Sequence, residues 1–158
     1  MARGTPATVA LTRAGVAFTL HEYAHDPHAA SYGLEAAEAL GLDPDQVFKT
    51  LLAELEGELV VAIVPVSARL DLKALARALG GSKAAMAEPK AAERATGYVT
   101  GGISPVGQKR TLRTVVDESA AAYDVVYVSA GRRGLDVGIA PADLVAATGA
   151  ITADISRW

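Results

Sequence analysis

Hydrophobic positions recur every three to four residues in five segments of the chain, which is the spacing of an amphipathic helix. Most of these segments begin at a capping residue or a proline, and several end at glycine, as helices commonly do. Helices are therefore expected from Pro6 to Gly15, Ser31 to Gly41, Asp71 to Leu79, Met86 to Gly97 and Pro141 to Thr148.

Between these segments, apolar residues alternate with polar ones or continue without interruption, as they do in strands. The run Leu59 to Val66 is apolar on both faces, which favours a central position in a sheet. It should form a hairpin with Val47 to Leu55 across Glu56-Gly57-Glu58. Further strands are expected at Phe18 to Tyr23, Leu112 to Val116, Val125 to Val128, Leu135 to Ile139 and Ile151 to Ile155.

The order of these elements is irregular and lacks the strand–helix alternation of a doubly wound parallel sheet. We therefore expect an α+β (mixed α/β) fold with a mixed, mainly antiparallel sheet flanked by helices. No low-complexity linker, repeat or shift in composition marks an internal boundary, so residues 1–158 are expected to form a single domain.

The composition narrows the class of protein. Of the 158 residues, 51% are hydrophobic but 5% aromatic, which excludes a disordered chain and predicts a core of small side chains. No apolar run is long enough to cross a bilayer and no secretory signal is visible, so a cytoplasmic protein without membrane contact is expected. The absence of cysteine excludes disulfides, thiolate metal sites and a cysteine nucleophile.

The net charge of −3 limits contact with nucleic acid. Proteins that bind duplex nucleic acid over a broad surface are normally basic, because neutralising phosphates dominates the affinity. A DNA partner is therefore not expected, and contact with RNA has to be local.

Lys49 is the first candidate for chemistry, since it lies in a predicted strand whose other residues are mainly apolar. An ammonium group pointing into a cleft can hold a phosphate or a carbonyl oxygen. The alternative is a strand lysine that turns outward and reaches water.

The second candidate is the loop Gly101 to Pro105, whose glycines let the backbone approach a ligand and present N–H groups to an oxyanion or a ribose hydroxyl. The alternative is a tight connection between a helix and a strand. The loop matches neither the Walker pattern nor the dinucleotide-binding glycine pattern.

Basic residues follow this loop at Lys109 and Arg110, and Arg132 lies in the glycine-rich turn between Ser129 and Asp136. Next to a pocket they predict local phosphate contacts, whereas elsewhere a short basic run is a solvated face. Ser129 lacks the sequence context of a serine-hydrolase nucleophile.

His21, His25 and His28 have a spacing that would bring them to one face of a helix. The strand-like pattern up to Tyr23 and the proline at Pro27 argue against a helix there, so a surface loop is favoured and no metal or other cofactor is expected.

Taken together, the motifs HEYAHDP, GLDPDQVFKTLL, LDLKALARALG, MAEPKAAERATGY, GGISPVGQKR and YVSAGRRGLDV resemble the bacterial YbaK family. Its members are free-standing aminoacyl-tRNA deacylases similar to the editing domain of bacterial prolyl-tRNA synthetases. The resemblance extends from about Thr5 to Ile155 and implies a curved, barrel-like sheet ringed by helices. It also implies a site formed by the strand lysine and the G-x-x-x-P loop, here Lys49 and Gly101 to Pro105.

The same resemblance assigns roles to individual residues. Backbone N–H groups of the loop, with Lys49, would act on the reacting ester, and further residues would line the substrate pocket. The loop residues are Gly101, Gly102, Ile103, Ser104 and Pro105, and the pocket residues are Tyr23, Tyr32, Thr50, Ser129 and Asp136.

The resemblance implies removal of cysteine from Cys-tRNA(Pro), and also from Cys-tRNA(Cys), with the substrate's own thiol attacking the ester carbonyl. Only the 3′ end of the mischarged tRNA would be bound, and prolyl-tRNA synthetase would be a transient partner. Two alternatives remain open: water-mediated hydrolysis of Ala-tRNA(Pro) or another mischarged tRNA, and a non-catalytic module that binds tRNA or the synthetase.

Overall fold

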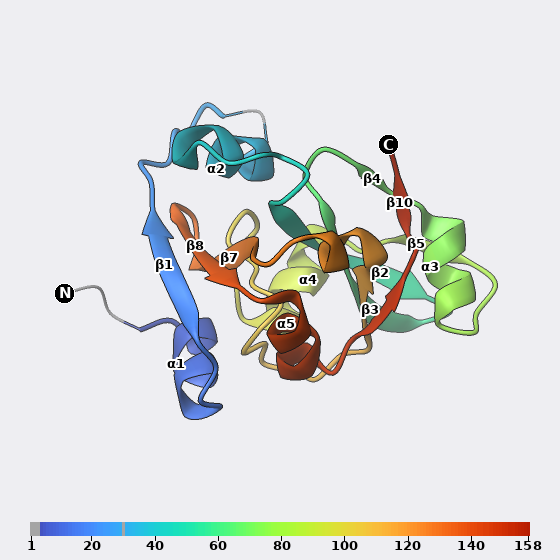
Figure 1. Cartoon of the computed structure of the whole chain (residues 1–158). Helices are drawn as coiled ribbons and strands as arrows, with labels where there is room; N and C mark the ends of the chain where they lie inside the picture. The colour runs from blue at the N-terminus through green and yellow to red at the C-terminus, as the bar shows by residue number, and fades with distance from the viewer. Residues whose placement is uncertain (1–3, 30) are drawn as a thin grey trace.

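A computed structural model describes residues 4–29 and 31–158 (Figure 1). All five predicted helical segments are helical, and Thr5, Ser31 and Asp71 cap three of them through side-chain hydrogen bonds, as their positions suggest. The α-helices are α1 (Pro6–Arg13), α2 (Tyr32–Leu40), α3 (Leu72–Ala78), α4 (Pro89–Thr96) and α5 (Pro141–Thr148), and a 3-10 helix, η1, spans Glu118–Ala122.

The strands form three sheets rather than the single curved, barrel-like sheet that was expected, and the described residues contain no closed barrel. The sheet orders are β1-β8-β7, β10-β4 and β5-β2-β3-β6-β9. The strands are β1 (Phe18–Glu22), β2 (Phe48–Leu55), β3 (Glu58–Pro65), β4 (Arg69–Leu70), β5 (Ala84–Met86), β6 (Thr114–Asp117), β7 (Val126–Arg132), β8 (Leu135–Ile139), β9 (Ile151–Ala153) and β10 (Ser156–Arg157).

The three-stranded and five-stranded sheets are joined at one point only. A single bridge between Val47 and Tyr127 joins the three-stranded sheet to the five-stranded one, and the register of β7 shifts between Ser129 and Arg132. The predicted mixture of pairings is confirmed, since β3-β6 and β6-β9 are parallel and the other five pairs are antiparallel.

The central position of β3 is confirmed by burial on both of its faces. Val61 and Ile63 pack into a cluster with α1 and the β7–β8 hairpin, whereas Val60, Ala62 and Val64 pack into a second cluster with α3. The hairpin from β2 to β3 turns at Glu56 and Gly57, both with positive φ, which is the geometry of a type I′ turn.

Several boundaries differ from the prediction, and one pair of short strands was not predicted. The fourth helix begins at Pro89 rather than Met86, because Ala84 to Met86 form β5 on the edge of β2. The sixth strand begins at Thr114 rather than Leu112. The short strands β4 and β10 pair with each other, and two-residue strands carry no periodicity that a sequence pattern could reveal.

No helix among residues 4–29 and 31–158 combines the length and apolar character that crossing a bilayer requires.

The segment after α4 is held by a buried tyrosine. The Tyr98 hydroxyl donates a hydrogen bond of 2.7 Å to the Val106 carbonyl and so closes residues 98–106 into a loop. Gly107 follows with φ +71°, and a Cβ there would lie 2.6 Å from the Pro6 carbonyl oxygen at the start of α1. This loop contains the predicted G-x-x-x-P segment, so its shape depends on these contacts.

Replacing Tyr98 by Phe should lower the free energy of unfolding by about 1–3 kcal/mol, because the Val106 carbonyl would remain buried without this donor. Urea denaturation measures the change. Tyr127→Phe is the control, since the Tyr127 hydroxyl makes no hydrogen bond within the described residues. An equal loss in both variants would show that the Tyr98 hydrogen bond contributes nothing specific.

Candidate functional site

A cavity of about 360 Å³ is lined by the end of the β1 segment, the start of α2, β2, the segment from β5 into α4, the loop after α4 and the β7–β8 hairpin. Eight of the sequence-predicted site residues line it, and they come from six separate parts of the chain. They are Tyr23, Tyr32, Lys49, Thr50, Gly101, Ile103, Ser129 and Asp136.

Lys49 enters the cavity from β2. Its ammonium group is half-buried, and its pKa is lowered from the ordinary value, chiefly by burial and further by the charge of Arg69. No carboxylate within the described residues lies close enough to form a salt bridge with it. A desolvated cation without a counter-ion is suited to an anionic ligand.

The neighbouring Thr50 also lines the cavity, although consecutive strand residues point to opposite faces. This is possible because β5 covers the edge of β2 only from Ala53 to Leu55, so the edge beside Thr50 is open to the cavity. The Thr50 Oγ1 is buried and has no hydrogen-bond partner among the described residues. A buried polar atom of this kind calls for a ligand or a water.

Asp136 provides the opposite charge on β8, where it pairs with Ser129 across the hairpin. The residue is 5% exposed, and burial raises the pKa of its carboxyl group to about 7. Burial, and next the nearby Asp136 carboxylate, raise the pKa of Tyr23 to about 12, so the phenol remains a hydrogen-bond donor at neutral pH.

The backbone of the loop after α4 forms a tight turn in which the Gly102 N–H donates to the Val99 carbonyl at 2.9 Å. Gly101 has φ +88°, and a Cβ there would lie 2.7 Å from the Tyr32 ring. Both the backbone conformation and the close approach of this ring therefore require glycine. The N–H groups of Gly101 and Ile103 have no acceptor within residues 4–29 and 31–158. These two residues line the cavity and supply candidate donors.

Three predicted loop residues do not line the cavity. The N–H of Gly102 is occupied by the turn and is not free to donate to an ester in this arrangement, and a Cβ on Gly102 would lie 2.8 Å from the Arg132 backbone. Ser104 is fully buried and its Oγ accepts from the Val106 N–H. Pro105 is likewise buried, so all three support the loop.

The predicted phosphate contacts also lie outside the cavity lining. Lys109 and Arg110 have exposed side chains, and their backbone N–H groups donate to the last carbonyls of α4. Arg132 lies 3.7 Å from Glu22 in an exposed ion pair.

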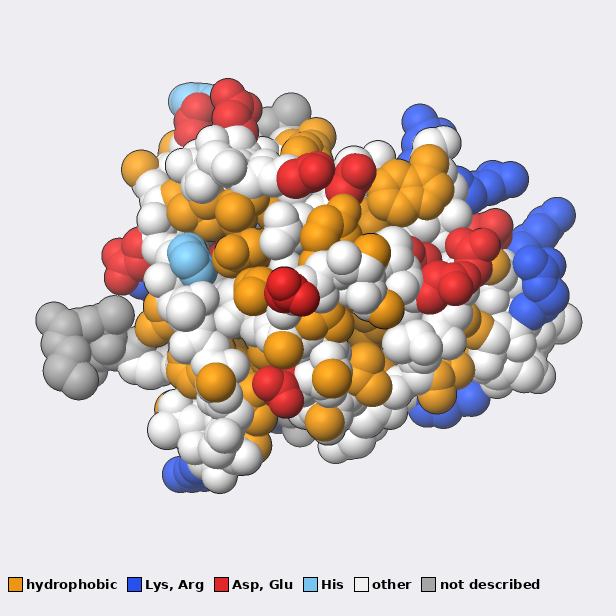
Figure 2. Space-filling view, in the orientation of Figure 1, with side chains coloured by type: hydrophobic (Ala, Val, Ile, Leu, Met, Phe, Trp, Pro, Cys, Tyr) orange, Lys and Arg blue, Asp and Glu red, His pale blue; other side chains and the backbone are white. Residues whose placement is uncertain are grey.

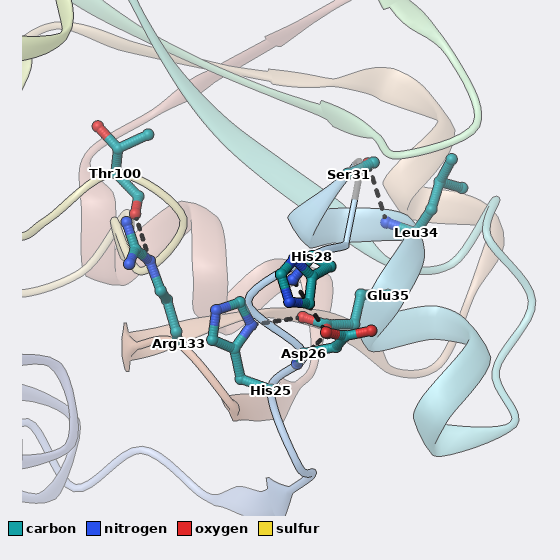
Figure 3. Close-up of polar contacts among 8 residues, drawn as sticks. All are labelled: His25, Asp26, His28, Ser31, Leu34, Glu35, Thr100 and Arg133. Atoms are coloured by element: carbon teal, nitrogen blue, oxygen red, sulfur yellow. Dashed lines mark hydrogen bonds and ion pairs between the residues drawn. The ribbon is translucent and has the colours of Figure 1, made fainter.

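Sequence reasoning missed a set of residues that hold the cavity rim (Figure 3). Arg133 donates through Nε to the Thr100 carbonyl at 2.8 Å, and its guanidinium carbon lies 5.0 Å from the centre of the Tyr32 ring. His25 and Glu35 form a contact of 2.8 Å between Nδ1 and Oε1. These contacts fix Tyr32 next to Gly101, and no spacing in the sequence links such distant positions.

The histidines do not share a common partner. His21 is hydrogen-bonded to Thr19 and His25 to Glu35. No group of three His, Cys, Asp or Glu in the part of the chain that the structure describes could hold a metal ion.

A model of the aminoacyl-tRNA editing domain matches residues 26–147 of this chain. The chain belongs to the aminoacyl-tRNA editing domain family. This family assignment agrees with the YbaK-type resemblance carried by the sequence motifs.

Curated relatives of this editing domain include a protein of Enterococcus faecalis named "Putative Cys-tRNA(Pro)/Cys-tRNA(Cys) deacylase EbsC". It is 40% identical over 122 residues, which are 76% of this chain and 74% of that protein. Proline–tRNA ligase of Desulforamulus reducens is 30% identical over 99 residues, covering 63% of this chain and 17% of the ligase.

Solved structures share the fold of this editing domain. A crystal structure described as a "putative trans-editing enzyme for prolyl tRNA synthetase" superposes with a TM-score of 0.85 at 28% identity, covering 99% of this chain and 100% of that one. The hypothetical protein APE2540 also gives a TM-score of 0.85, at 26% identity, and covers 97% and 100% of the two chains.

The raised pKa of Asp136 makes stability depend on pH. Between about pH 4 and pH 7 the folded carboxyl group holds a proton that the unfolded chain has released, so stability falls as pH rises through this window. From about pH 5 to pH 8, the unfolding free energy of the wild type should fall by about 2–3 kcal/mol relative to Asp136→Asn. Urea denaturation at both pH values measures it.

Asp124→Asn is the matched control, because Asp124 is exposed in the turn before β7. It should follow the wild type at both pH values. A parallel pH profile for Asp136→Asn and the wild type would show that the buried carboxyl group titrates normally.

Proposed function

We propose that this protein is a trans-editing deacylase that removes cysteine from Cys-tRNA(Pro), and also from Cys-tRNA(Cys). The observation that carries the proposal is a small cavity, in an editing-domain chain, that contains a half-buried cation and a buried carboxyl group, neither of which has an ion-pair partner among the described residues. An aminoacyl ester at the 3′ end of an RNA carries the complementary charges, a phosphate and an α-ammonium. The name of the Enterococcus relative supports cysteine as the amino acid.

In the proposed complex, Asp136 holds the α-ammonium group and Lys49 holds the phosphate of the terminal adenosine. The pKa of the Asp136 carboxyl group then falls from about 7, because a cation next to a carboxylate favours ionisation. The Thr50 hydroxyl gains a partner in the ligand, which offsets its burial. These three contacts orient the ester relative to the Gly101 loop.

The chemical step uses the thiol of the substrate. Its sulfur attacks the ester carbonyl carbon, the new C–S bond closes a cyclic thiolactone, and the C–O bond to the ribose breaks. The proton lost by the thiol ends on the leaving ribose oxygen, which restores the tRNA 3′ end. The N–H groups of Gly101 and Ile103 stabilise the oxyanion that forms between these events.

The mechanism requires no nucleophile from the protein, which is consistent with a chain that contains no cysteine. Holding the thiol next to the carbonyl gives an intramolecular reaction, and the protein contributes orientation and charge stabilisation. Contact of the tRNA with Lys109, Arg110 and Arg132, and a transient complex with prolyl-tRNA synthetase, remain part of the proposal. The ligase similarity supports the second of these.

Lys49→Ala should reduce single-turnover deacylation of Cys-tRNA(Pro) by about 100-fold, the cost of losing one electrostatic contact to the reacting complex. Lys49→Arg should retain part of the rate, because it keeps the charge but not its shape. Arg113→Gln is the control, since Arg113 forms an exposed ion pair with Glu58 and does not line the cavity. A rate for Lys49→Ala equal to that of the wild type would remove Lys49 from the site.

Deacylation of Cys-tRNA(Pro) should be much faster than that of Ser-tRNA(Pro), because a hydroxyl is a far weaker nucleophile than a thiol of similar shape. Parallel single-turnover assays with Cys-, Ser- and Ala-tRNA(Pro) measure the ratio. Equal rates for cysteine and serine, or a preference for alanine, would indicate attack by water. Binding of tRNA without cleavage of any ester would identify a non-catalytic module.

A further inference from the structure

A second groove, of about 480 Å³, lies beside the two-stranded sheet of β4 and β10 and is lined by Ser67, Arg69, Arg157 and Trp158. Arg69 and Arg157 are directly opposite in the antiparallel register, so their side chains leave the same face of the sheet. Trp158 is 69% exposed, more than any other large hydrophobic side chain among the described residues. Figure 2 shows Lys and Arg side chains gathered on the side of the molecule where α3 and the C-terminus lie in Figure 1.

This arrangement is unfavourable for the isolated fold. Like charges directly opposite each other in a sheet repel, and an exposed tryptophan leaves a large apolar surface in water. Two carboxylates offset part of the charge. Asp71 lies 3.8 Å from the Arg157 Nε, and Asp45 accepts a hydrogen bond from Ser67. Arg69 has no ion pair within the described residues.

The groove and the cavity of the candidate site are connected along the chain. Lys49 pairs with Val64 on β3, and the chain continues from there through Pro65 to Arg69 on β4. The charge of Arg69 is near enough to lower the pKa of Lys49. Lys49 at the cavity and Arg69 at the groove are therefore connected through β3 and its continuation into β4.

We propose that the groove binds the single-stranded RNA that precedes the aminoacylated adenosine. Arg69 and Arg157 contact successive phosphates, and the indole of Trp158 stacks on a base. Paired cations with an exposed aromatic ring are what a flexible single strand requires, since every base offers a face for stacking. The inference rests on the proposed function for its choice of ligand.

The test uses a short fluorescently labelled single-stranded RNA ending in CCA, titrated with the intact protein. Trp158→Ala should weaken binding by about 5- to 100-fold, the range expected for loss of one stacked base, whereas Trp158→Phe should retain most of the affinity. Arg69→Gln should weaken binding and reduce the slope of log affinity against log salt by about 0.7, as expected for one lost phosphate contact. Arg113→Gln should bind as the wild type does.

Trp158 is the single tryptophan of the chain, so its fluorescence reports directly on the groove. The RNA should quench the tryptophan emission of the wild type and of Arg113→Gln with the same midpoint as the labelled-RNA titration. Agreement between the two midpoints distinguishes binding at the groove from a change in overall folding, which also alters tryptophan emission.

Unchanged affinity in both Trp158→Ala and Arg69→Gln would overturn the proposal, as would equal affinity for the same RNA annealed to its complement. If these two variants lost binding to prolyl-tRNA synthetase but still bound the RNA, the groove would be a protein-docking surface. That result would also overturn the proposal. Deacylation assayed in parallel separates the two proposals. A wild type that cleaves no ester, but whose RNA binding depends on Trp158 and Arg69, would refute the proposed function and leave the groove assignment standing.

Discussion

The loop of residues 98–107 packs against two other parts of the fold through glycines, at positions where a side chain would not fit. Gly102 meets the backbone of Arg132 at the β7–β8 turn, and Gly107 meets the backbone of Pro6 at the start of α1. Tyr98 closes the loop through the Val106 carbonyl, and its ring lies where a Cβ on Gly131 would be. Because backbone packs on backbone, the loop has little freedom to move without displacing α1 or the hairpin.

This packing determines which hydrogen-bond donors and which side chains line the cavity. The turn that uses the Gly102 N–H leaves those of Gly101 and Ile103 without acceptors at the cavity wall. The absent Cβ of Gly101 lets the Tyr32 ring approach, and Arg133 binds both the ring and the Thr100 carbonyl. The glycines of the loop thus serve two purposes, since Gly102 fixes the loop and Gly101 admits Tyr32.

The sequence predicted those features that depend on local patterns. Caps at Thr5 and Ser31 defined two helix starts, and the doubly apolar run through Ile63 identified the central strand. It did not predict β4, β5 or β10, whose pairing partners are distant in the sequence and whose two or three residues show no periodicity. The split into three sheets also escaped prediction, because the pairing of strands far apart in the sequence has no local signature.

The same distinction holds for the site. Residue type singled out Lys49, and the family motifs singled out Asp136, and both line one cavity. The sequence could not separate loop residues that line the cavity from those that support it, since Gly101 and Gly102 are neighbours of identical type. It also missed Arg133, whose role depends on a contact between the hairpin and α2.

A protein with an acidic net charge can still bind an anionic ligand if its carboxylates are engaged in other contacts. Glu35 accepts from the Asp26 N–H, and Glu93 accepts from the Thr100 N–H, so each ties down a segment that borders the cavity. Burial alone would raise the pKa of Glu35, but hydrogen bonds with His25 and with the Asp26 N–H lower it, and the Thr100 N–H lowers the pKa of Glu93. Both carboxyl groups therefore stay ionised while they hold the backbone. Lys49 has no such partner among the described residues, and its charge remains available at the cavity. Local placement, rather than total charge, thus determines which sign of ligand the cavity attracts.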